Sequence, residues 1–358
     1  MSNQEQELRV FRGLPGSGKS TEAEKLVQSD PDRWVRVNRD DIRFELYNKY
    51  VILNSKGEMD KNAENHVTEV EKRRMNDAFK AGKSVVSDNT NLGIKTVKKH
   101  IALAQSHGVK VTHQDFPVPL EEVQRRNAAR SRVVEPWVIN RMHKQSMGPN
   151  GEFHLFPGSY PLRPFVKPAS KEHAVVYDMD GTTTDISGIR HFVRGKYRNF
   201  DAFHRSSLFC PPNQDVLDMM HDTAAAGLTN IVVTARNREY EDVTVKWLDD
   251  HNAPFSNIYM RKDGDQRKDN IVKAEILEDI LVDYDVVHAV DDRPEVIDVW
   301  HSAGIQTTLV PGLDYTDEEI AAGKPISIVN PLRAGRCLRC GRPISGGRAL
   351  GPTCEKIG

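Results

Sequence analysis

The sequence predicts an α/β protein with two doubly wound parallel-sheet domains and a small cysteine-containing tail. Its 358 residues exceed what one small core needs, because domains have roughly 100 to 200 residues. Two short apolar segments, residues 8–12 and 174–177, each lead directly into a turn rich in glycine or aspartate. Strand-like and helix-like segments then alternate in both halves, which is the pattern of a parallel sheet covered by helices.

The expected elements follow this alternation along the chain. In the first half, the expected strands are residues 8–12, 34–37, 84–87 and 109–116, and the expected helices include 67–81 and 120–129. In the second half, the expected strands are residues 174–177, 230–234 and 286–290, and the expected helices are 214–226, 239–252 and 270–282. The second half does not repeat the sequence of the first.

Changes of composition set the expected domain boundaries. Residues 147–170 are dense in proline, which neither helices nor central strands tolerate. The prolines are Pro149, Pro157, Pro161, Pro164 and Pro168. From residue 331 the chain is rich in Gly, Arg and Cys, with no clear periodicity. We therefore expect a first domain at residues 1–146, a linker at 147–170, a second domain at 171–330 and a tail at 331–358.

Overall composition excludes several classes of protein. Hydrophobic residues make up 38% and charged residues 28% of the chain, which suits globular cores and argues against disorder. The 50 Lys and Arg balance the 51 Asp and Glu, so a globally basic nucleic-acid coat is excluded and only local basic patches remain. The first residues lack the regions of a signal peptide, and no apolar run could span a bilayer. The expected location is therefore the cytoplasm, with no membrane partner.

The turn after the first strand predicts a phosphate-binding loop. Gly13-Leu-Pro-Gly-Ser-Gly-Lys-Ser20 matches G-x-x-x-x-G-K-[ST] and lies between an apolar strand and an expected helix, as the motif requires. Backbone N–H groups in such a loop surround phosphate oxygens, the lysine reaches the β and γ phosphates, and the serine hydroxyl can hold Mg²⁺. The candidate nucleotide-binding residues are Gly13, Gly16, Ser17, Gly18, Lys19, Ser20 (also a candidate Mg²⁺ ligand) and Thr21.

Two further features of the first half suit phosphoryl transfer. Asp40 and Asp41 follow the second strand, where a carboxylate can accept the proton of an attacking hydroxyl. The alternative is that one of them caps a helix. Residues 123–146 carry six basic residues against Glu135 alone, a local charge of +5. An arginine-rich lid over a nucleotide explains this excess.

These motifs resemble those of the 5′ polynucleotide kinase domain in the end-healing kinase-phosphatases of T-even phages. The resemblance covers most of residues 7–146. Its matching stretches are residues 13–20, Asn38-Arg39-Asp40-Asp41, Ser87-Asp88-Asn89-Thr90-Asn91-Leu92 and Arg126-Asn127-Ala128-Ala129-Arg130. It implies that ATP is the donor, that Asp40 is the general base on a 5′-hydroxyl and that Arg130 stabilises the transferring phosphoryl group. It also implies acceptor contacts, from Arg43 to a 3′-phosphate and from the loop of Asp88, Thr90 and Asn91, where Asn89 is an insertion.

The second domain opens with paired carboxylates. Val175-Val-Tyr-Asp178-Met-Asp180-Gly-Thr182 is an apolar strand that ends in D-x-D-G-T, and it resembles the first motif of the haloacid dehalogenase phosphatases. Two carboxylates one residue apart can serve as nucleophile (Asp178) and as the group that protonates the leaving oxygen (Asp180). Their charge implies Mg²⁺, with Asp178 and Asp180 as candidate ligands. A capped turn or a calcium loop is the alternative.

Later motifs of that superfamily follow in order. Thr234 ends a strand and is placed to bind phosphoryl oxygens, and Asp291 and Asp292 end another and are candidate Mg²⁺ ligands. Lys268 and Lys273 both have workable spacing for the lysine that neutralises the phosphoryl group. The resemblance to the phage phosphatase domain favours Lys273. It also implies functional roles for Arg236, Asp269 and an arginine near Arg190.

The tail holds three of the four cysteines. Cys337-Leu-Arg-Cys340 resembles half of a zinc knuckle, and Cys354 is the third candidate ligand, whereas a structural zinc takes four. The alternative is reduced thiols in a flexible tail. Six basic residues against Glu355 give residues 331–358 a charge of +5, which suits contact with a phosphate backbone.

The leading hypothesis from the sequence is a bifunctional polynucleotide 5′-kinase and 3′-phosphatase that prepares RNA or DNA ends for a ligase. One alternative is a bifunctional kinase and phosphatase for a small metabolite or nucleoside. Another is a non-catalytic, nucleotide-dependent end-binding module, which would have no need of Lys19, Asp40, Asp178 or Asp180. The sequence leaves open whether RNA or DNA is preferred and whether the chain forms homo-oligomers.

Overall fold

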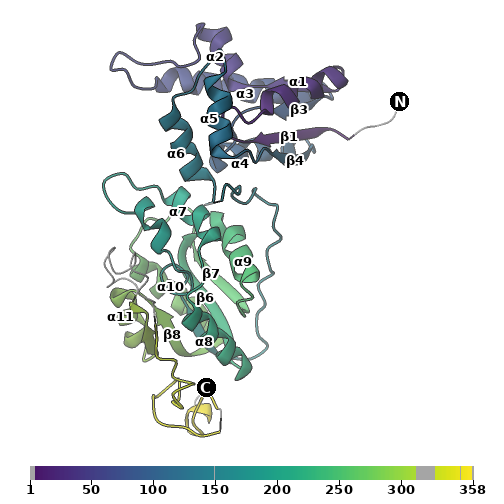
Figure 1. The fold of residues 1–358 in the computed structure, drawn as a ribbon. Helices are drawn as coiled ribbons and strands as arrows, with labels where there is room; N and C mark the ends of the chain where they lie inside the picture. The colour runs from purple at the N-terminus through teal and green to yellow at the C-terminus, as the bar shows by residue number, and fades with distance from the viewer. Residues whose placement is uncertain (1–4, 149, 312–326, 347, 357–358) are drawn as a thin grey trace. The chain divides into compact units, whose positions relative to one another are not determined.

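The computed structural model describes residues 5–148, 150–311, 327–346 and 348–356. Pro149, one of the linker prolines, lies outside these ranges. The chain divides into two compact units, residues 1–159 and 160–358, and the division falls within the proline-rich stretch. Each unit contains one sheet flanked by helices (Figure 1).

The first unit is built on four parallel strands in the order β2-β3-β1-β4. The strands are β1 (Glu7–Arg12), β2 (Trp34–Val37), β3 (Ser84–Ser87) and β4 (Lys110–Asp115). The helices are α1 (Lys19–Ser29), α2 (Arg39–Tyr47), α3 (Lys61–Lys80), α4 (Ile94–Ser106), α5 (Leu120–Ala128) and α6 (Pro136–Ser146). Successive side chains of β1 point to opposite faces, so Leu8 and Val10 pack in the core with α3 and α4, whereas Phe11 packs with α1.

The second unit is built on five parallel strands in the order β7-β6-β5-β8-β9. The strands are β5 (Glu172–Tyr177), β6 (Thr229–Asn237), β7 (Asn257–Arg261), β8 (Tyr284–Asp291) and β9 (Gln306–Leu309). The α-helices are α7 (Phe200–Ser206), α8 (Gln214–Ala225), α9 (Glu241–Asp250), α10 (Asp269–Asp283) and α11 (Pro294–Ser302). Short 3₁₀ helices are η1 (Ser187–Phe192), η2 (Ser207–Phe209), η3 (Arg238–Tyr240) and η5 (Cys354–Lys356).

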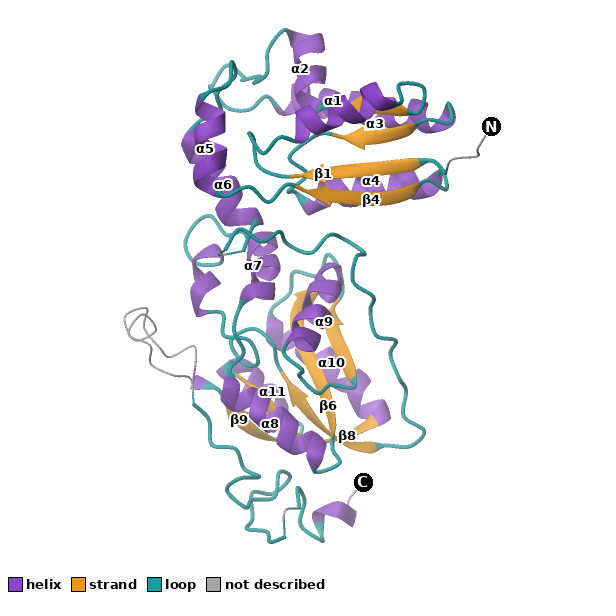
Figure 2. Cartoon of the chain, turned by 45° about the vertical axis from the view of Figure 1, so that its right-hand side comes forward, coloured by secondary structure: helices purple, strands orange, loops and turns teal. Residues whose placement is uncertain are grey.

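Helices cover both faces of this second sheet. Val176 of β5 belongs to the core that α10 and α11 close. The next residue, Tyr177, points the other way, and its hydroxyl lies 2.9 Å from the hydroxyl of Thr223 in α8. Figure 2 shows the strands of each unit as a separate sheet with helices beside it. The predicted α/β class with two doubly wound parallel sheets is therefore confirmed.

The parallel arrangement decides where function can lie. In such sheets the carboxyl ends of all strands meet at one edge, where loops bind ligands. In the first unit that edge carries Lys19 in the first turn of α1, Asp40 in the first turn of α2 and Asp88 in the loop after β3. In the second unit it carries Asp178 after β5, Thr234 in β6 and Asp291 at the end of β8. The candidate residues from distant parts of each half therefore gather at one edge.

Candidate active sites

The loop of residues 13–18 connects β1 to α1 in a shape that requires glycine. Gly16 and Gly18 have φ angles of 89° and 100°, in the left-handed region that other residues rarely adopt. A Cβ on Gly13 would lie 2.5 Å from the Ser17 hydroxyl oxygen. Ser17 is buried, and Thr21 is exposed in the first turn of α1. The loop thus has the strand-loop-helix geometry of a phosphate cradle.

Lys19 is folded back onto this loop. Its Nζ donates to the carbonyl oxygens of Gly13 and Leu14, both at 2.8 Å, and to the Ser17 hydroxyl at 3.2 Å. Burial lowers the pKa of Lys19 to about 8, the carboxylate of Asp88 raises it, and the positive charge of Arg130 lowers it. Below that pKa the ammonium is charged, and a bound phosphate would offer it a stronger partner than neutral carbonyl groups do.

Asp88 lies against the phosphate-binding loop. Its side chain is 1% exposed, and it accepts hydrogen bonds from the Ser20 hydroxyl at 3.3 Å and from Arg36 Nε at 2.8 Å. The resemblance implied an acceptor contact for Asp88. The structure brings its carboxylate to Ser20, the candidate Mg²⁺ ligand, and the acceptor contact stays a prediction.

Thr90 and Asn91 hold the loop after β3 in place. The buried Asn91 has a φ of 48°, and its Nδ2 donates to the carbonyl oxygens of Phe11 at 2.8 Å and Ser87 at 3.0 Å. The backbone N–H of Gly13 donates to the Thr90 carbonyl at 3.1 Å. These contacts tie the β3 loop to the phosphate-binding loop, so the Asn91 side chain is occupied with backbone groups.

Asp40 lies in the first turn of α2, where a different residue provides the cap. Asn38 accepts from the backbone N–H groups of Asp40 at 2.8 Å and Asp41 at 3.2 Å. The capping alternative for Asp40 and Asp41 is therefore wrong. The Asp40 side chain is 39% exposed and accepts from Arg43 at 2.8 Å and from Arg132. It points into a cluster of arginines rather than onto the helix end.

Arg43 is held on both sides by carboxylates. Its Nε donates to Glu64 at 2.6 Å, in addition to its contact with Asp40. The hydrogen bond to Glu64 raises the pKa of Arg43. Arg39 donates to the same Glu64 at 2.9 Å and to the buried Glu71 at 2.8 Å. Glu64 and Glu71 were not anticipated from the sequence, because no motif marks these two positions of α3.

The lid consists of α5, α6 and the loop between them. Asn127 closes that loop, because its side chain donates to the Val134 carbonyl at 2.7 Å and accepts from the Val134 N–H at 3.0 Å. The lid also touches the phosphate-binding loop, since a Cβ on Gly16 would lie 3.0 Å from the Val123 carbonyl oxygen. The loop carries the exposed Arg130 and the Arg132 that reaches Asp40. Arg132 of the lid thus contacts Asp40, and the positive charge of Arg130 lowers the pKa of Lys19.

The second site centres on Asp178, at the end of β5. Lys273 of α10 donates to Asp178 at 2.6 Å and to Asp291 at 2.7 Å, and its side chain is 2% exposed. Burial works against the charge on Lys273, but Asp178 and Asp291 outweigh it and raise its pKa. Lys268 is exposed beside the N-terminus of α10. Of the two candidate lysines, the structure therefore brings Lys273 into the site.

Three buried carboxylates suit a divalent cation at this point. Candidate ligand oxygens of Asp178, Asp291 and Asp292 all lie within 4.8 Å of one another. Burial, with the nearby negative charges, raises the pKa of Asp178 to about 7 and that of Asp292 well above its ordinary value. Asp292 Oδ1 is buried and has no hydrogen-bond partner among the described residues. A divalent cation fits this group, because one hydrogen-bonded lysine leaves most of the negative charge of the three carboxylates unbalanced.

Asp180 has a different environment. Arg236 is 1% exposed and binds both oxygens of Asp180, at 2.8 Å from Nε and 2.5 Å from Nη2. Burial would raise the pKa of Asp180, but Arg236 outweighs it, so the pKa is lowered. The structure does not bring this carboxylate into the group of Asp178, Asp291 and Asp292. His204 of α7 lies 3.9 Å from Asp180, and burial lowers its pKa to about 4.

The other predicted residues of this site also lie at the sheet edge. Thr234 is buried and accepts from the Arg236 N–H at 3.2 Å. Asp269 begins α10 and pairs with Arg261 at 2.5 Å and with Arg293 at 3.2 Å. Gly181 must be glycine, since a Cβ there would lie 2.3 Å from Asp292 Oδ2. Arg261 and His204 were not anticipated, because they come from elements without a recognisable motif, and Arg293 directly follows the Asp291-Asp292 motif but was given no role.

The three tail cysteines come together. Sulfur atoms of Cys337, Cys340 and Cys354 lie within 4.8 Å of one another, and Cys337 and Cys354 are buried. The Gly351 N–H donates to Cys337 Sγ at 3.4 Å. Neighbouring Cys340 and Cys337, with burial, raise the pKa of Cys354 to about 11. Such crowding of thiols suits a soft metal ion, for which the described residues offer three ligands.

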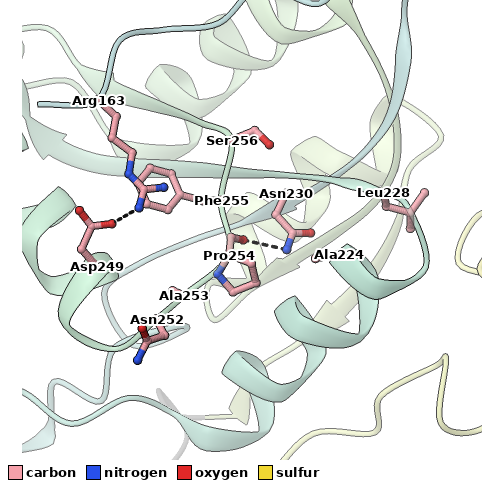
Figure 3. Close-up of a pocket in the computed structure, with 10 residues that line it drawn as sticks. All are labelled: Arg163, Ala224, Leu228, Asn230, Asp249, Asn252, Ala253, Pro254, Phe255 and Ser256. Carbon is pink, nitrogen blue, oxygen red and sulfur yellow. Dashed lines mark hydrogen bonds and ion pairs between the residues drawn. The ribbon is translucent and has the colours of Figure 1, made fainter.

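A pocket of about 430 Å³ is lined by Asn230, near the start of β6, and by Arg163 and Asp249 (Figure 3). Asn230 donates to the Pro254 carbonyl there at 2.9 Å. Arg163 pairs with Asp249 in the same pocket. These polar groups satisfy one another and lie away from the carboxyl edge of the sheet, so we assign no chemistry to this pocket.

Comparison with known families identifies both halves. Residues 8–147 match the family model described as an AAA domain. Residues 172–315 match that of the polynucleotide kinase PNKP phosphatase domain. Each half of the chain therefore matches a different family model. The predicted combination of a P-loop kinase-type half with a phosphatase half of this family is confirmed, and the two domains imply the use of a nucleotide and a divalent cation.

Similar proteins include two with described functions. A protein of Autographa californica nuclear polyhedrosis virus, described as a bifunctional polynucleotide kinase/RNA ligase, is 26% identical over 323 residues, which are 87% of this chain and 43% of that protein. The chain thus spans less than half the length of that relative. Human NEDD4-binding protein 2 is 32% identical over 125 residues, or 34% of this chain and 7% of its own length.

Similar solved structures include the Pnkp1/Rnl/Hen1 complex. The likeness has 24% identity and a TM-score of 0.35, and covers 85% of this chain and 96% of that one. A class C acid phosphatase from Bacillus anthracis has 16% identity and a TM-score of 0.33, with 44% of this chain and 81% of that chain covered. Among the described residues, no helix combines the length and apolar character needed to cross a membrane.

Proposed function

We propose that the chain is a bifunctional end-healing enzyme, which phosphorylates 5′-hydroxyl ends and removes 3′-phosphates from RNA or DNA. The observation that carries this proposal is the pairing of a P-loop domain with a PNKP-type phosphatase domain in one chain. The products, a 5′-phosphate and a 3′-hydroxyl, are the ends that a nucleic-acid ligase joins. We therefore propose a ligase as the functional partner, which accords with the description of the viral relative.

We assign the kinase step to residues 13–21, Asp40 and the lid. ATP is the proposed donor, with its phosphates in the loop, Lys19 on the β and γ phosphates and Ser20 beside Mg²⁺. Asp40 accepts the proton of the 5′-hydroxyl as that oxygen attacks the γ-phosphorus, and ADP leaves. Arg130 is placed to neutralise the transferring group, and Arg43 to bind a phosphate of the acceptor. Binding of that phosphate would compete with the carboxylates that hold Arg43 in the structure.

We assign the phosphatase step to the second site. Asp178 attacks the phosphorus of the 3′-phosphate, the bond to the 3′-oxygen breaks, and Asp180 passes to that oxygen the proton that a monoanionic 3′-phosphate brings to the site. A water molecule, deprotonated by Asp180, then attacks the phosphoryl group on Asp178 and releases inorganic phosphate. We assign Lys273 and Thr234 to the phosphoryl oxygens, Arg236 to the positioning of Asp180, and Asp269 to the positioning of Arg261 and Arg293. Mg²⁺ held by Asp178, Asp291 and Asp292 would supply positive charge for the transferred group.

We further propose that residues 1–146 and 171–330 are the catalytic domains and that residues 147–170 link them. We also propose that the tail of residues 331–358 binds zinc. The converging sulfur atoms of Cys337, Cys340 and Cys354 support the zinc site. Elemental analysis should find one zinc per chain, and three freely titratable tail thiols without zinc would reject the site. Deleting the tail should weaken oligonucleotide binding in a salt-dependent way.

The function is tested with labelled ATP and 5′-hydroxyl oligonucleotides of RNA and DNA, beside a panel of sugars and nucleosides. Transfer to oligonucleotides and release of phosphate from 3′-phosphorylated ends would support the proposal. Transfer confined to small molecules would favour a metabolite enzyme. Nucleotide-dependent binding of ends without either reaction would favour the binding module.

A further inference from the structure

A segment of the second unit is anchored at both ends to the loop that carries Asp178 and Asp180. Residues 185–212 leave this loop and return to it. The Asp185 N–H donates to the Pro211 carbonyl at 3.0 Å, and the Asn213 N–H donates to the Thr183 carbonyl at 2.8 Å. We call residues 185–212 the cap segment. These two hydrogen bonds fix both ends of the cap segment at the catalytic loop.

The outer part of the cap segment is basic and aromatic. Residues 194–200 read Arg-Gly-Lys-Tyr-Arg-Asn-Phe and contain no carboxylate. Tyr197 is 85% exposed and Phe200 is 52% exposed. Arg194, Lys196 and Arg198 are exposed as well, and Lys196 Nζ lies 5.7 Å from the centre of the Tyr197 ring. Exposed rings interleaved with cations are the composition of a surface that binds a single nucleic-acid strand.

A line of rings leads from this surface to the catalytic carboxylate. Phe200 and His204 are four residues apart in α7 and therefore share one face, with ring centres 6.4 Å apart in a stacked arrangement. The His204 side chain is 14% exposed, and its buried Nδ1 lies 3.9 Å from Asp180 Oδ2 with no hydrogen-bond partner among the described residues. Phe200 is thus exposed at one end of a stack whose other end faces the group assigned to protonate the leaving 3′-oxygen.

We propose that residues 194–200 bind the 3′-terminal nucleotides of a single strand for the phosphatase site. Bases stack on Phe200 and Tyr197, while Arg194, Lys196 and Arg198 face the backbone phosphates. The inference rests on the proposed phosphatase function and adds the surface that selects a polynucleotide over a small phosphate ester. A single strand is favoured over a duplex, because the rings need base faces that pairing and stacking within a duplex cover.

The aromatic contacts are tested with Tyr197→Ala and Phe200→Ala in the full chain. The two substrates are a 3′-phosphorylated single-stranded oligonucleotide and p-nitrophenyl phosphate. For each variant, kcat/KM on the oligonucleotide should fall by about 5- to 150-fold, the range for one lost base stack, mainly through KM. Hydrolysis of p-nitrophenyl phosphate should not change, and Phe200→Tyr should restore oligonucleotide turnover because it keeps the ring.

The cationic contacts are tested with Lys196→Gln and Arg198→Gln. Each should lower oligonucleotide affinity and reduce the slope of log K against log salt concentration by about 0.7, the value per phosphate contact on a single strand. Lys171→Gln is the matched control. Lys171 is also exposed, but it immediately precedes β5, at the strand end opposite Asp178.

The outcomes separate this inference from the proposed function. Unchanged oligonucleotide kinetics in both aromatic variants would overturn the binding surface and leave the phosphatase function intact. Equal losses on both substrates would also overturn it, because they would indicate a structural role for the two rings. If the unaltered chain hydrolyses p-nitrophenyl phosphate but no 3′-phosphorylated oligonucleotide, the proposed function fails, and this inference fails with it.

Discussion

The two candidate sites place their key carboxylates in opposite environments. In the first unit, the Asp40 side chain is 39% exposed and is bound by two arginines, Arg43 and Arg132. In the second, Asp178 is buried beside two other carboxylates, and its pKa is raised to about 7. In the first site, partly exposed arginines balance the carboxylates, and a substrate phosphate can compete for these arginines. The second has an excess of buried negative charge and therefore depends on Lys273 and a bound cation.

Loss of the phosphatase nucleophile should have the largest effect. Asp178→Asn replaces the attacking carboxylate with an amide, so phosphate release should fall by about 10³-fold or more. Kinase turnover should stay near that of the unaltered chain, because Asp40 and Asp178 belong to different units. Both reactions are measured on the same preparation with 5′-hydroxyl and 3′-phosphate oligonucleotides. Phosphate release by Asp178→Asn at more than a tenth of the original rate would contradict the assignment.

Substitutions in the kinase site should have the opposite effect, with loss of 5′ transfer and no loss of phosphatase activity. Lys19→Ala removes the phosphate contact and Asp40→Asn removes the base, and each should lower 5′ transfer by about 10²-fold or more. Phosphatase activity in the same samples serves as the control and should be unaffected. Asp41→Asn is a matched variant, because Asp41 is the neighbouring carboxylate and contacts Arg36 instead. Full transfer by Asp40→Asn, with loss in Asp41→Asn, would move the base to Asp41.

Lys273 should matter for stability as well as for activity. Lys273→Ala leaves Asp178 and Asp291 buried without their hydrogen-bonded cation, which should lower the free energy of unfolding by about 3–5 kcal/mol. Mg²⁺ should recover part of this loss, because it supplies the missing positive charge. Thermal melts with Mg²⁺ and with a chelator measure the effect, and Lys268→Ala is the exposed control. Equal melting of both variants, or a greater loss of activity in Lys268→Ala, would contradict the role of Lys273.

The sequence predicted the parts of each site that are local in the chain. Lys19, Asp178 and Asp180 belong to short motifs that follow strands, and the spacing of residues within each motif was enough to predict the chemistry of these side chains. Pairings between distant residues could not be predicted, as shown by Arg132, which reaches Asp40 across 92 residues. Strand β9 was also missed, because Gln306-Thr-Thr-Leu309 is a partly exposed edge strand without an apolar run. Local motifs thus identify the chemistry, whereas the partners that tune it depend on the tertiary fold.

The smallest expected effect concerns how the tail attaches to the second unit. The buried His288 contacts the Leu338 carbonyl through Nδ1 at 3.1 Å and the Thr308 hydroxyl through Nε2 at 2.9 Å. Because a carbonyl only accepts, Nδ1 carries the proton, and the neutral ring accepts from Thr308 at Nε2. Burial lowers the pKa of His288 from 6.5 to about 4. The neutral imidazole therefore contributes its full stability above pH 6.5, and this contribution is lost as the pH falls towards 4.

Hydrogen exchange can detect this loss at the tail itself. Between pH 7.5 and pH 5 the destabilisation should reach at most about 2 kcal/mol. After correction for intrinsic rates, the Leu338 N–H, which donates to the Ala349 carbonyl at 3.0 Å, should lose protection at pH 5. His288→Gln does not titrate in this range, so its protection should not depend on pH. Equal pH dependence in the unaltered chain and in His288→Gln would show that another group controls the docking of the tail.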